Sequence, residues 1–524
     1  MAGVNPSMAT TADTDVIVIG SGIGGLCCGA LLARYGLRVT ICESHTIPGG
    51  AAHGFERQGF RFDSGPSLYS GLSSRPSTNP LRHVLDALDE ADSLTWANYD
   101  TWGVRIPEGD FDTTIGNDQF CQVLQRVRGE KAVQEWRRLQ QVMAPLGRAA
   151  TALPPAILRL DWGALQTVLP YGWELLQNAT ALAQSSQPFS TVLNRTVTDP
   201  FIRHWMDMLC FLLSGLPAEG TSTAEMAFMF AEWYRPGVTL DYPIGGSAAL
   251  VNALVRGLKK FGGTLRLGAH VQDILVQNGR ATGVKLRSGE ILTAGTAVVS
   301  NASIWDTLPL VPAGALPASF VVERKAMPTC PSFLHLHLGI DATGLPEDLA
   351  CHYITLQDWD LGITAPHNLI VMSIPTVLDP SLAPAGKHTI HVYTPATEPY
   401  ELWQGLDRRS AEYAALKAQR AKPLWQALER VIPDVRQRVE VELVGTPLTH
   451  ERFLRRYRGS YGPAISVQDG LVPSGKTPLP GLWCTGDCTF PGIGLPAVAA
   501  SGWIVANTLV PVTKQRPVLQ VALP

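Results

Sequence analysis

The sequence lacks the features that define several classes of protein. Its most apolar internal stretch, Trp205–Leu216, is only twelve residues long and contains Asp207, so it is too short to span a bilayer. The first dozen residues contain no Lys, no Arg and no apolar run, so we expect no signal or transit peptide. Charged residues make up 17% of the 524 residues, and the formal net charge of −3 gives no general attraction to nucleic acid.

The cysteines do not show the paired spacing of a metal site or a disulfide framework. There are nine, and two pairs lie close in sequence, Cys27–Cys28 and Cys484–Cys488. The first pair lies among Gly and Leu in a predicted helix, where cysteine packs as a small apolar residue. The second has no matching pair elsewhere, so we expect no metal and an intracellular, reducing location.

Residues 15–43 follow the pattern of a nucleotide-binding β-α-β unit. A β-branched strand at 15–19 leads into glycines in G-x-G-x-x-G spacing, a helix at 26–35 and a strand at 37–42. The first glycine makes the tight turn, the second admits a pyrophosphate, and the third packs helix against strand. The helix N-terminus attracts the phosphates. Glu43 follows, where a carboxylate accepts hydrogen bonds from ribose hydroxyls and disfavours a 2′-phosphate.

A second glycine pair favours FAD over NAD as the nucleotide. Gly49 and Gly50 follow the ribose-binding acid and bring backbone close to a bulky ligand again. The Pro-Gly-Gly at 48–50 and the Phe-x-Phe-Asp-x-Gly-Pro-Ser of Phe60–Ser67 resemble the phytoene desaturases and carotenoid isomerases. Ala51 and Ala52 stand where amine oxidases have a basic residue, which argues against an amine substrate.

The C-terminal part makes this resemblance specific. TPLTHERFLRRYRGSYGPA at 446–464 and PLPGLWCTGDCTFPGIGLPAVAASG at 478–502 resemble the signature of the carotenoid (prolycopene) isomerase branch. We interpret 482–485 as a final strand, Asp487 as a ligand of the ribityl chain or pyrophosphate, and 497–507 as a helix that points at the flavin. Ile493 and Ala500 replace the Gln and Phe of the family pattern, which changes the wall beside the flavin.

The expected fold is α/β: a Rossmann-type FAD-binding domain of a two-dinucleotide-binding-domain flavoprotein, with a mixed α+β substrate domain inserted in sequence. We assign 13–75, 241–320 and 441–510 to the FAD-binding domain, 76–240 and 321–440 to the membrane-facing substrate domain, and 1–12 and 511–524 to tails. Within 241–300 the chain resembles the superfamily's β-meander and return strand. The predicted cofactor-binding residues are Gly20, Gly22, Gly24, Gly25, Glu43, Ser44, Gly49, Gly50, Ala51, Val271, Gly486, Asp487, Gly494, Leu495, Pro496 and Ala497.

Aromatic and Met side chains gather in the substrate domain, at Trp205, Met206, Met208, Phe211, Met226, Phe228, Met229, Phe230, Trp233 and Tyr234. Such a cluster forms either a buried core or the lining of an apolar tunnel, and both interpretations stay open here. Glu225, Glu232 and His204 are the ionisable candidates for catalysis near this cluster. His335 and His337 share one strand face, but the sequence offers no third ligand, so no metal is predicted.

Together with the resemblance, these features predict an FAD enzyme that acts on a long apolar polyene such as a carotenoid. The resemblance implies cis–trans isomerisation by reduced flavin, with desaturation or saturation as alternatives. A non-enzymatic binding module of the Rab escort or GDP-dissociation-inhibitor type is a further alternative. A water-insoluble substrate implies peripheral membrane association, at a thylakoid or plasma membrane in a phototroph, and Trp205–Leu216 is the predicted entrance.

Overall fold

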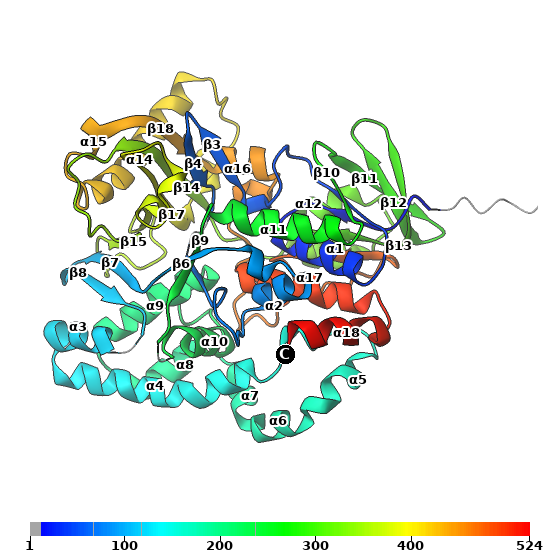
Figure 1. Cartoon of the computed structure of the whole chain (residues 1–524), viewed down its shortest axis with the longest axis horizontal. Helices are drawn as coiled ribbons and strands as arrows, with labels where there is room; N and C mark the ends of the chain where they lie inside the picture. Colours follow the sequence, from blue (N-terminus) through cyan, green and yellow to red (C-terminus); the bar gives the residue numbers. More distant parts are fainter. Residues whose placement is uncertain (1–11, 66–67, 117, 236, 524) are drawn as a thin grey trace, which may run out of the picture.

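A computed structural model describes residues 12–65, 68–116, 118–235 and 237–523, and two large sheets organise these residues (Figure 1). Residues 1–11 of the predicted N-terminal tail lie outside the described residues, as do Pro66 and Ser67 of the Phe60–Ser67 motif. No helix within the described ranges combines the length and the apolar character needed to cross a bilayer.

The first sheet is built on the predicted β-α-β unit. β1 (Thr14–Ile19) lies between β2 (Val39–Cys42) and β13 (Ile291–Ser300) and pairs in parallel with both. Val16, Ile17 and Val18 are fully buried, because helices cover the sheet and leave no polar face for alternation. The order is β10–β2–β1–β13–β12–β11, with β19 also paired to β13; the remaining strands are β10 (Thr264–Arg266), β11 (Val271–Gln277), β12 (Arg280–Leu286) and β19 (Leu482–Cys484).

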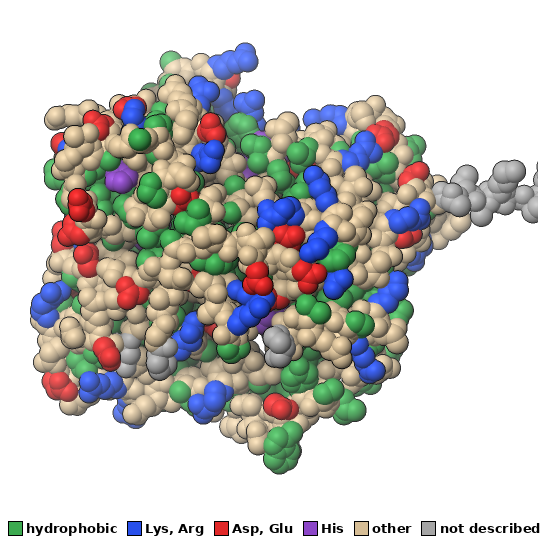
Figure 2. Space-filling model, viewed as in Figure 1, with side chains coloured by type: hydrophobic (Ala, Val, Ile, Leu, Met, Phe, Trp, Pro, Cys, Tyr) green, Lys and Arg blue, Asp and Glu red, His purple; other side chains and the backbone are tan. Residues whose placement is uncertain are grey.

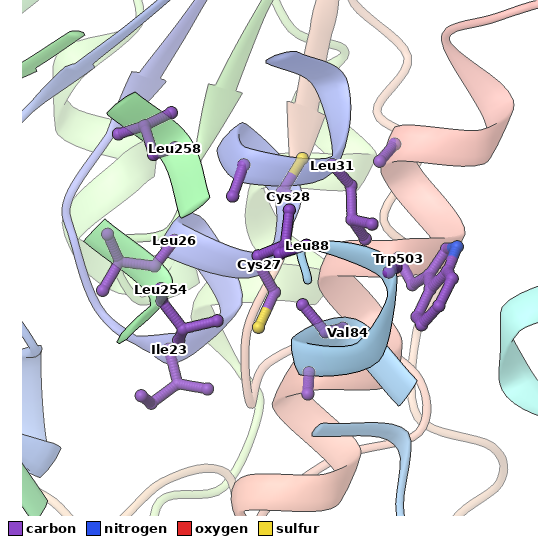
Figure 3. Close-up of a cluster of buried hydrophobic side chains, with 14 of the residues drawn as sticks. Ile23, Leu26, Cys27, Cys28, Leu31, Val84, Leu88, Leu254, Leu258 and Trp503 are labelled. Atoms are coloured by element: carbon purple, nitrogen blue, oxygen red, sulfur yellow. The ribbon is translucent and has the colours of Figure 1, made fainter. Parts of the chain in front are cut away.

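α1 (Ile23–Arg34) is the centre of the helical layer on this sheet. Figure 3 shows its apolar side chains between α11 (Ser247–Lys260) on one side and α17 (Leu495–Thr508) with α2 (Pro80–Ala87) on the other. Cys27 and Cys28 are fully buried in this layer, and the burial raises the pKa of both thiols. They therefore pack as the small apolar residues that the sequence predicts.

The C-terminal segment 511–524, expected to be a tail, contains the packed helix α18 (Val512–Ala522). α18 packs on α2, and its buried Gln515 donates to the backbone oxygen of Ala156 at 3.0 Å and accepts from Arg159 Nη1 at 2.9 Å. Its contacts thus extend the helical layer of the first sheet. The pattern of Val512, Val518 and Ala522 on one buried face is the sequence signal for this helix.

The second sheet has the order β18–β14–β17–β16–β15–β7–β8 and includes strands from both predicted domains. β14 (Ser332–Asp341) pairs antiparallel with β17 (Lys387–Glu398) and with β18 (Val439–Gly445), so residues 441–445 belong to this sheet and not to the first. The other strands are β7 (Thr101–Ile106), β8 (Gly109–Thr114), β15 (His352–Leu356) and β16 (Leu369–Ser373). Smaller sheets, β3 (Gly54–Arg57) with β4 (Phe60–Asp63) and β5 (Tyr69–Ser70)–β9 (Leu240–Pro243)–β6 (Trp96–Tyr99), connect the parts.

Between β8 and β9 the chain is helical: α3, α4 and α8 to α10 form a layer beside β7 and β8, whereas α5 and α6 lie away from these strands, on the side of α18 (Figure 1). The helices of this segment are α3 (Asp118–Arg128), α4 (Glu130–Thr151), α5 (Ala164–Val168), α6 (Gly172–Gln177), α7 (Ala179–Ser185), α8 (Phe189–Thr196), α9 (Pro200–Ser214) and α10 (Thr223–Trp233). Shorter or later helices are α12 (Ile304–Thr307), α13 (Ala318–Lys325), α14 (Ala411–Glu429), α15 (Val435–Arg438) and α16 (Pro447–Leu454).

The aromatic and Met cluster of α9 and α10 is a hydrophobic core. Trp205, Met206, Met208 and Met226 are at most 1% exposed and pack with the apolar side chains of α3, α4 and β7. The stretch Trp205–Leu216 therefore presents no continuous apolar surface, and its burial does not support the expectation that it forms a membrane entrance.

Candidate functional site

A large cavity is lined by residues of both large sheets and has a volume of about 1100 Å³. Its wall combines the glycine loop after β1, residues of β14 and β17, helix α16 and the loop before α17. The predicted cofactor residues on this wall are Gly20, Gly22, Gly24, Glu43, Ser44, Gly49, Gly50, Ala51, Val271, Gly486, Asp487, Gly494 and Leu495. The other three, Gly25, Pro496 and Ala497, lie in α1 and α17 next to wall residues.

The glycine loop is packed so closely that it excludes side chains. A β-carbon on Gly22 would lie 2.6 Å from Oδ1 of Asn301, and one on Gly25 would lie 2.3 Å from the carbonyl oxygen of Gly20. Gly20 itself has a φ of +91°, a conformation that glycine adopts without strain. This cradle of bare backbone is the shape that a pyrophosphate requires.

Asn301 makes hydrogen bonds to both β1 and the turn after β19, and it is not among the residues predicted from the sequence. It follows β13, where its backbone N–H donates to Ile19 O at 2.8 Å and its side-chain amide donates to Thr485 O at 3.1 Å. The amide thereby links the loop after β1 to the turn after β19. Its position directly after a buried strand was the available signal, since ligand sites lie at the carboxyl ends of parallel strands.

The Glu43 carboxylate lies in the cavity wall and is 8% exposed. Oε2 accepts hydrogen bonds from the backbone N–H of Ser21 at 2.8 Å and its hydroxyl at 2.7 Å, while Oε1 accepts from the His45 N–H at 2.7 Å. The Ser44 hydroxyl donates a longer hydrogen bond to Oε1, at 3.3 Å. These four bonds fill the roughly four acceptor positions of a carboxylate, so a ribose hydroxyl would take the place of the long Ser44 bond. The charged end of Glu43 is thus fixed in place and fits the ribose of a dinucleotide.

At the opposite end of the cradle, Asp487 is held by a partly exposed ion pair with Arg456. The guanidinium also donates to the carbonyl oxygens of Ser460 at 2.5 Å and Tyr461 at 2.8 Å. Burial disfavours the charge of Arg456, but the neighbouring Asp487 carboxylate outweighs this effect and raises the Arg456 pKa above its ordinary value. Arg456 therefore orients Asp487, which the sequence analysis predicted as a cofactor ligand without its partner.

Four histidines form a stacked column on the cavity side of the second sheet. His335 Nδ1 lies 2.6 Å from His391 Nε2, and His335 Nε2 lies 2.6 Å from His450 Nε2. His337 stacks on His391 and its Nε2 lies 3.1 Å from Asp63 O. Burial lowers the pKa of His337 to about 4 and of His450 to about 3, and it lowers those of His335 and His391 well below their ordinary value. All four are thus neutral near pH 7.

The strand register supplies the third histidine that the sequence analysis did not find. His391 on β17 lies opposite His337 on β14, and the ligand atoms of His335, His337 and His391 lie within 4.8 Å of one another. Their ring planes are, however, nearly parallel, at 6° to 18°. More decisively, His335 Nδ1 and His391 Nε2 lie 2.6 Å apart, which is a hydrogen-bond distance, whereas two nitrogen ligands of one tetrahedral ion lie about 3.4 Å apart. The geometry fits hydrogen-bonded neutral imidazoles better than a metal centre.

The three catalytic candidates lie away from the cavity wall. Glu225 closes a capping box with Ser222, whose backbone N–H donates to it at 3.0 Å at the start of α10. Glu232 accepts a hydrogen bond from Thr78, and His204 stacks on Trp359 with ring centroids 5.2 Å apart. Each of these side chains has a structural partner, so the geometry does not support a catalytic role for them.

Because these histidines are buried and neutral, we expect the folded protein to become less stable at acidic pH. We expect the free energy of unfolding to fall as the pH drops from about 6.5 towards 4, because unfolded histidine takes up a proton in this range while the folded His337, with a pKa of about 4, does not. The shift of the His337 pKa from 6.5 to about 4 lowers the free energy of unfolding by about 3 kcal/mol over this pH range, because each pKa unit corresponds to about 1.4 kcal/mol. Urea unfolding at a series of pH values tests this, with His337→Phe as the variant that flattens the profile. Equal midpoints at pH 5 and pH 7 would contradict it.

Comparison with known proteins agrees with this geometry. The family model described as an NAD(P)-binding Rossmann-like domain matches residues 18–88. An oxidoreductase from Methanosarcina mazei has a similar structure, with a TM-score of 0.61 and 20% identity over 94% of this chain and 99% of that one. An α/β protein with a Rossmann-type nucleotide-binding domain is thus the class that fold and cavity define, as the sequence predicts.

Two relatives of known activity identify the family within this class. Prolycopene isomerase 1, chloroplastic, from an Oncidium hybrid cultivar is 34% identical over 97% of this chain and 86% of its own length. A neurosporene-forming phytoene desaturase from Cereibacter sphaeroides is 25% identical over 96% of both. The chain belongs to the prolycopene isomerase family, which confirms the resemblance seen in the sequence and gives no support to the non-enzymatic alternative.

Proposed function

We propose that this protein is an FAD-dependent enzyme that converts cis to trans double bonds in a carotenoid or a similar long polyene. The observation that carries the proposal is the shared cavity, in which the glycine cradle, Glu43 and Asp487 line one space with apolar residues such as Phe211, Leu212 and Ile493. The membership of the prolycopene isomerase family supports the substrate class. The phytoene desaturase relative supports desaturation as the second candidate.

Residues at each end of the cavity have complementary tasks in holding FAD. Glu43 would accept the ribose hydroxyls of the adenosine part, and the backbone of Gly22 would face the pyrophosphate. Asp487, oriented by Arg456, would accept from the ribityl chain, and the N-terminus of α17 favours negative charge nearby. When bound, the reduced flavin supplies electron density that can lower the bond order of a conjugated double bond for a time.

Neutral histidines lie on the cavity wall that also carries the apolar residues. His335, His391 and His450 are neutral and hydrogen-bonded to one another, so they add polar edges to the cavity without adding charge. A charged wall would disfavour an apolar polyene because its desolvation would be costly. We infer that this wall orients the substrate and that it excludes ionic side reactions.

An anaerobic assay with the photoreduced holoenzyme tests the reaction. Poly-cis lycopene and phytoene are offered side by side, and products are separated by chromatography and mass. Isomerisation gives a trans product of unchanged mass while the reduced flavin is required but not consumed. A gain of two hydrogens with oxidation of the reduced flavin would replace isomerisation with saturation. A loss of two hydrogens with reduction of the flavin, in a parallel assay that starts from the oxidised holoenzyme, would replace it with desaturation.

The Ile493→Gln variant is expected to change the product distribution more than the affinity for flavin. Ile493 lines the cavity and packs against the apolar core of the helical layer, so a polar side chain there alters the substrate wall and not the glycine cradle. The ratio of cis and trans products by chromatography, with flavin content by absorbance, checks this; Ile493→Val is the matched control. Ala500, the second departure from the family pattern, is fully buried in α17 away from the cavity wall, so we expect no comparable effect there.

A further inference from the structure

Large apolar side chains project into solvent from a short helical segment that the proposed function does not use. We call residues 162–187, which include α5, α6 and α7, the apolar arm. Its most exposed side chains are between 65% and 88% exposed: Trp162, Leu165, Leu169, Trp173 and Leu176. The arm forms the lower edge of the molecule in Figure 1, and Figure 2 shows apolar side chains protruding there.

The composition of the arm differs from that of a water-facing surface. Glu174 is the only charged residue in 162–187, whereas charged residues make up 17% of the whole chain. The remaining polar residues are Gln, Asn, Ser and Thr, and Tyr171 joins the two tryptophans. Trp and Tyr with uncharged polar neighbours are typical of the interface between lipid headgroups and acyl chains.

The base of the arm is fixed to the helical layer of the first sheet. Arg159 is buried and donates to Asp161 Oδ1 at 2.7 Å, to Val510 O at 2.7 Å and to Gln515 Oε1 at 2.9 Å. The backbone N–H of Leu160 donates to Thr508 Oγ1 at 2.9 Å. At its other end, α7 packs on α4 and α10. The apolar side chains are therefore presented from a firmly attached support.

We propose that the apolar arm inserts into the interfacial layer of a lipid bilayer and docks the protein on the membrane. The arm projects outward from the body of the molecule (Figure 1), so a soft lipid layer accommodates it, whereas a protein partner would need a matching concave pocket. Its lack of charge favours a neutral lipid surface over an acidic or basic protein. The docking itself is argued from the exposed side chains of the arm. Only its purpose, to draw an apolar substrate from the lipid, rests on the proposed function.

Vesicle binding tests the docking surface directly. The full-length holoenzyme is mixed with phosphatidylcholine vesicles, and bound protein is measured by sedimentation at low and high salt. We expect binding that is unaffected by salt, because exposed charge contributes little. In the Trp162→Ser/Trp173→Ser double variant we expect binding to fall by roughly 100-fold, about tenfold for each indole removed from the apolar layer.

A matched control and a second readout make the test specific. Val322→Ser on α13 changes a side chain that is 68% exposed, close to the 67% of Leu165, and it should leave vesicle binding unchanged. Vesicles with brominated acyl chains should quench the fluorescence of the wild type and not that of the double variant. Activity on detergent-dispersed substrate should be equal in wild type and double variant, so a failure of the proposed reaction is seen separately.

Three outcomes would overturn the proposal. The first is a wild type that does not sediment with vesicles in any salt, and the second is a double variant that sediments as well as the wild type. The third is a wild type that forms dimers without lipid in analytical ultracentrifugation while the double variant does not, which would assign the arm to contact with a second copy of this chain.

Discussion

The Gly22→Val variant is expected to lose its flavin while remaining folded. Gly22 lines the cavity, and even a β-carbon there would lie 2.6 Å from Oδ1 of Asn301. A larger side chain must displace that amide or enter the space that we assign to the pyrophosphate. If the steric clash of the Val side chain costs the complex with FAD about 3 kcal/mol, the affinity for FAD falls by roughly 100-fold. The ratio of flavin absorbance to protein absorbance after purification measures the effect.

Two further variants keep this prediction specific. Gly172→Val, at a site with no heavy atom within 4 Å of the added β-carbon, controls for the substitution itself and should retain flavin. Glu43→Gln removes the charge beside the ribose without adding volume, and it should weaken flavin retention even if Gly22→Val fails to fold. Full flavin content in a folded Gly22→Val protein would show that the cradle does not hold the pyrophosphate.

The nucleotide half of the site could be predicted because its signal is local. Strand, glycine loop, helix and Glu43 follow one another within thirty residues, and each has a requirement that few residue types meet. The turn at Gly486 and Asp487 was recognisable for the same reason, since a short strand and a small-residue helix flank it.

The substrate half of the site depends on pairings that the sequence does not reveal. His391 reaches His335 only through the antiparallel register of β14 and β17, and His450 approaches from α16. Arg456 stands in a run of arginines, and nothing local distinguishes the one that turns inward to Asp487. Such contacts join residues far apart in the chain, so periodicity alone does not identify them.

Two interpretations that the structure does not support had local signals that pointed the other way. Ser222 stands three residues before Glu225, which is the spacing of a capping box, so a structural role for this glutamate was readable from the sequence. The stretch Trp205–Leu216 was chosen as a membrane surface because it is the most apolar, but the most apolar segments of a large domain form its core. The arm is less apolar on average and is held to the rest of the chain mainly at its two ends.

The Arg456→Met variant is expected to lower the free energy of unfolding by about 3–5 kcal/mol, because it leaves the Asp487 carboxylate unpaired in a largely buried site. The carbonyl oxygens of Ser460 and Tyr461 lose their donor as well. Urea unfolding of the apoprotein measures the change without a contribution from bound flavin. Flavin content of the purified variant then reports whether Asp487 still has the orientation that cofactor binding requires.

A double variant shows whether stability is lost because the attraction between the two charges is gone or because the Asp487 charge is left unpaired. In Arg456→Met/Asp487→Leu both charges are gone, so we expect a large part of the stability to return although flavin retention stays low. Arg456→Lys keeps the charge but loses the planar fork that donates to both the carboxylate and the backbone, so its stability should lie between the wild type and Arg456→Met. If the single and double variants are equally unstable, packing of the Arg456 stem and not its charge stabilises this turn, and Asp487 is oriented by the backbone alone.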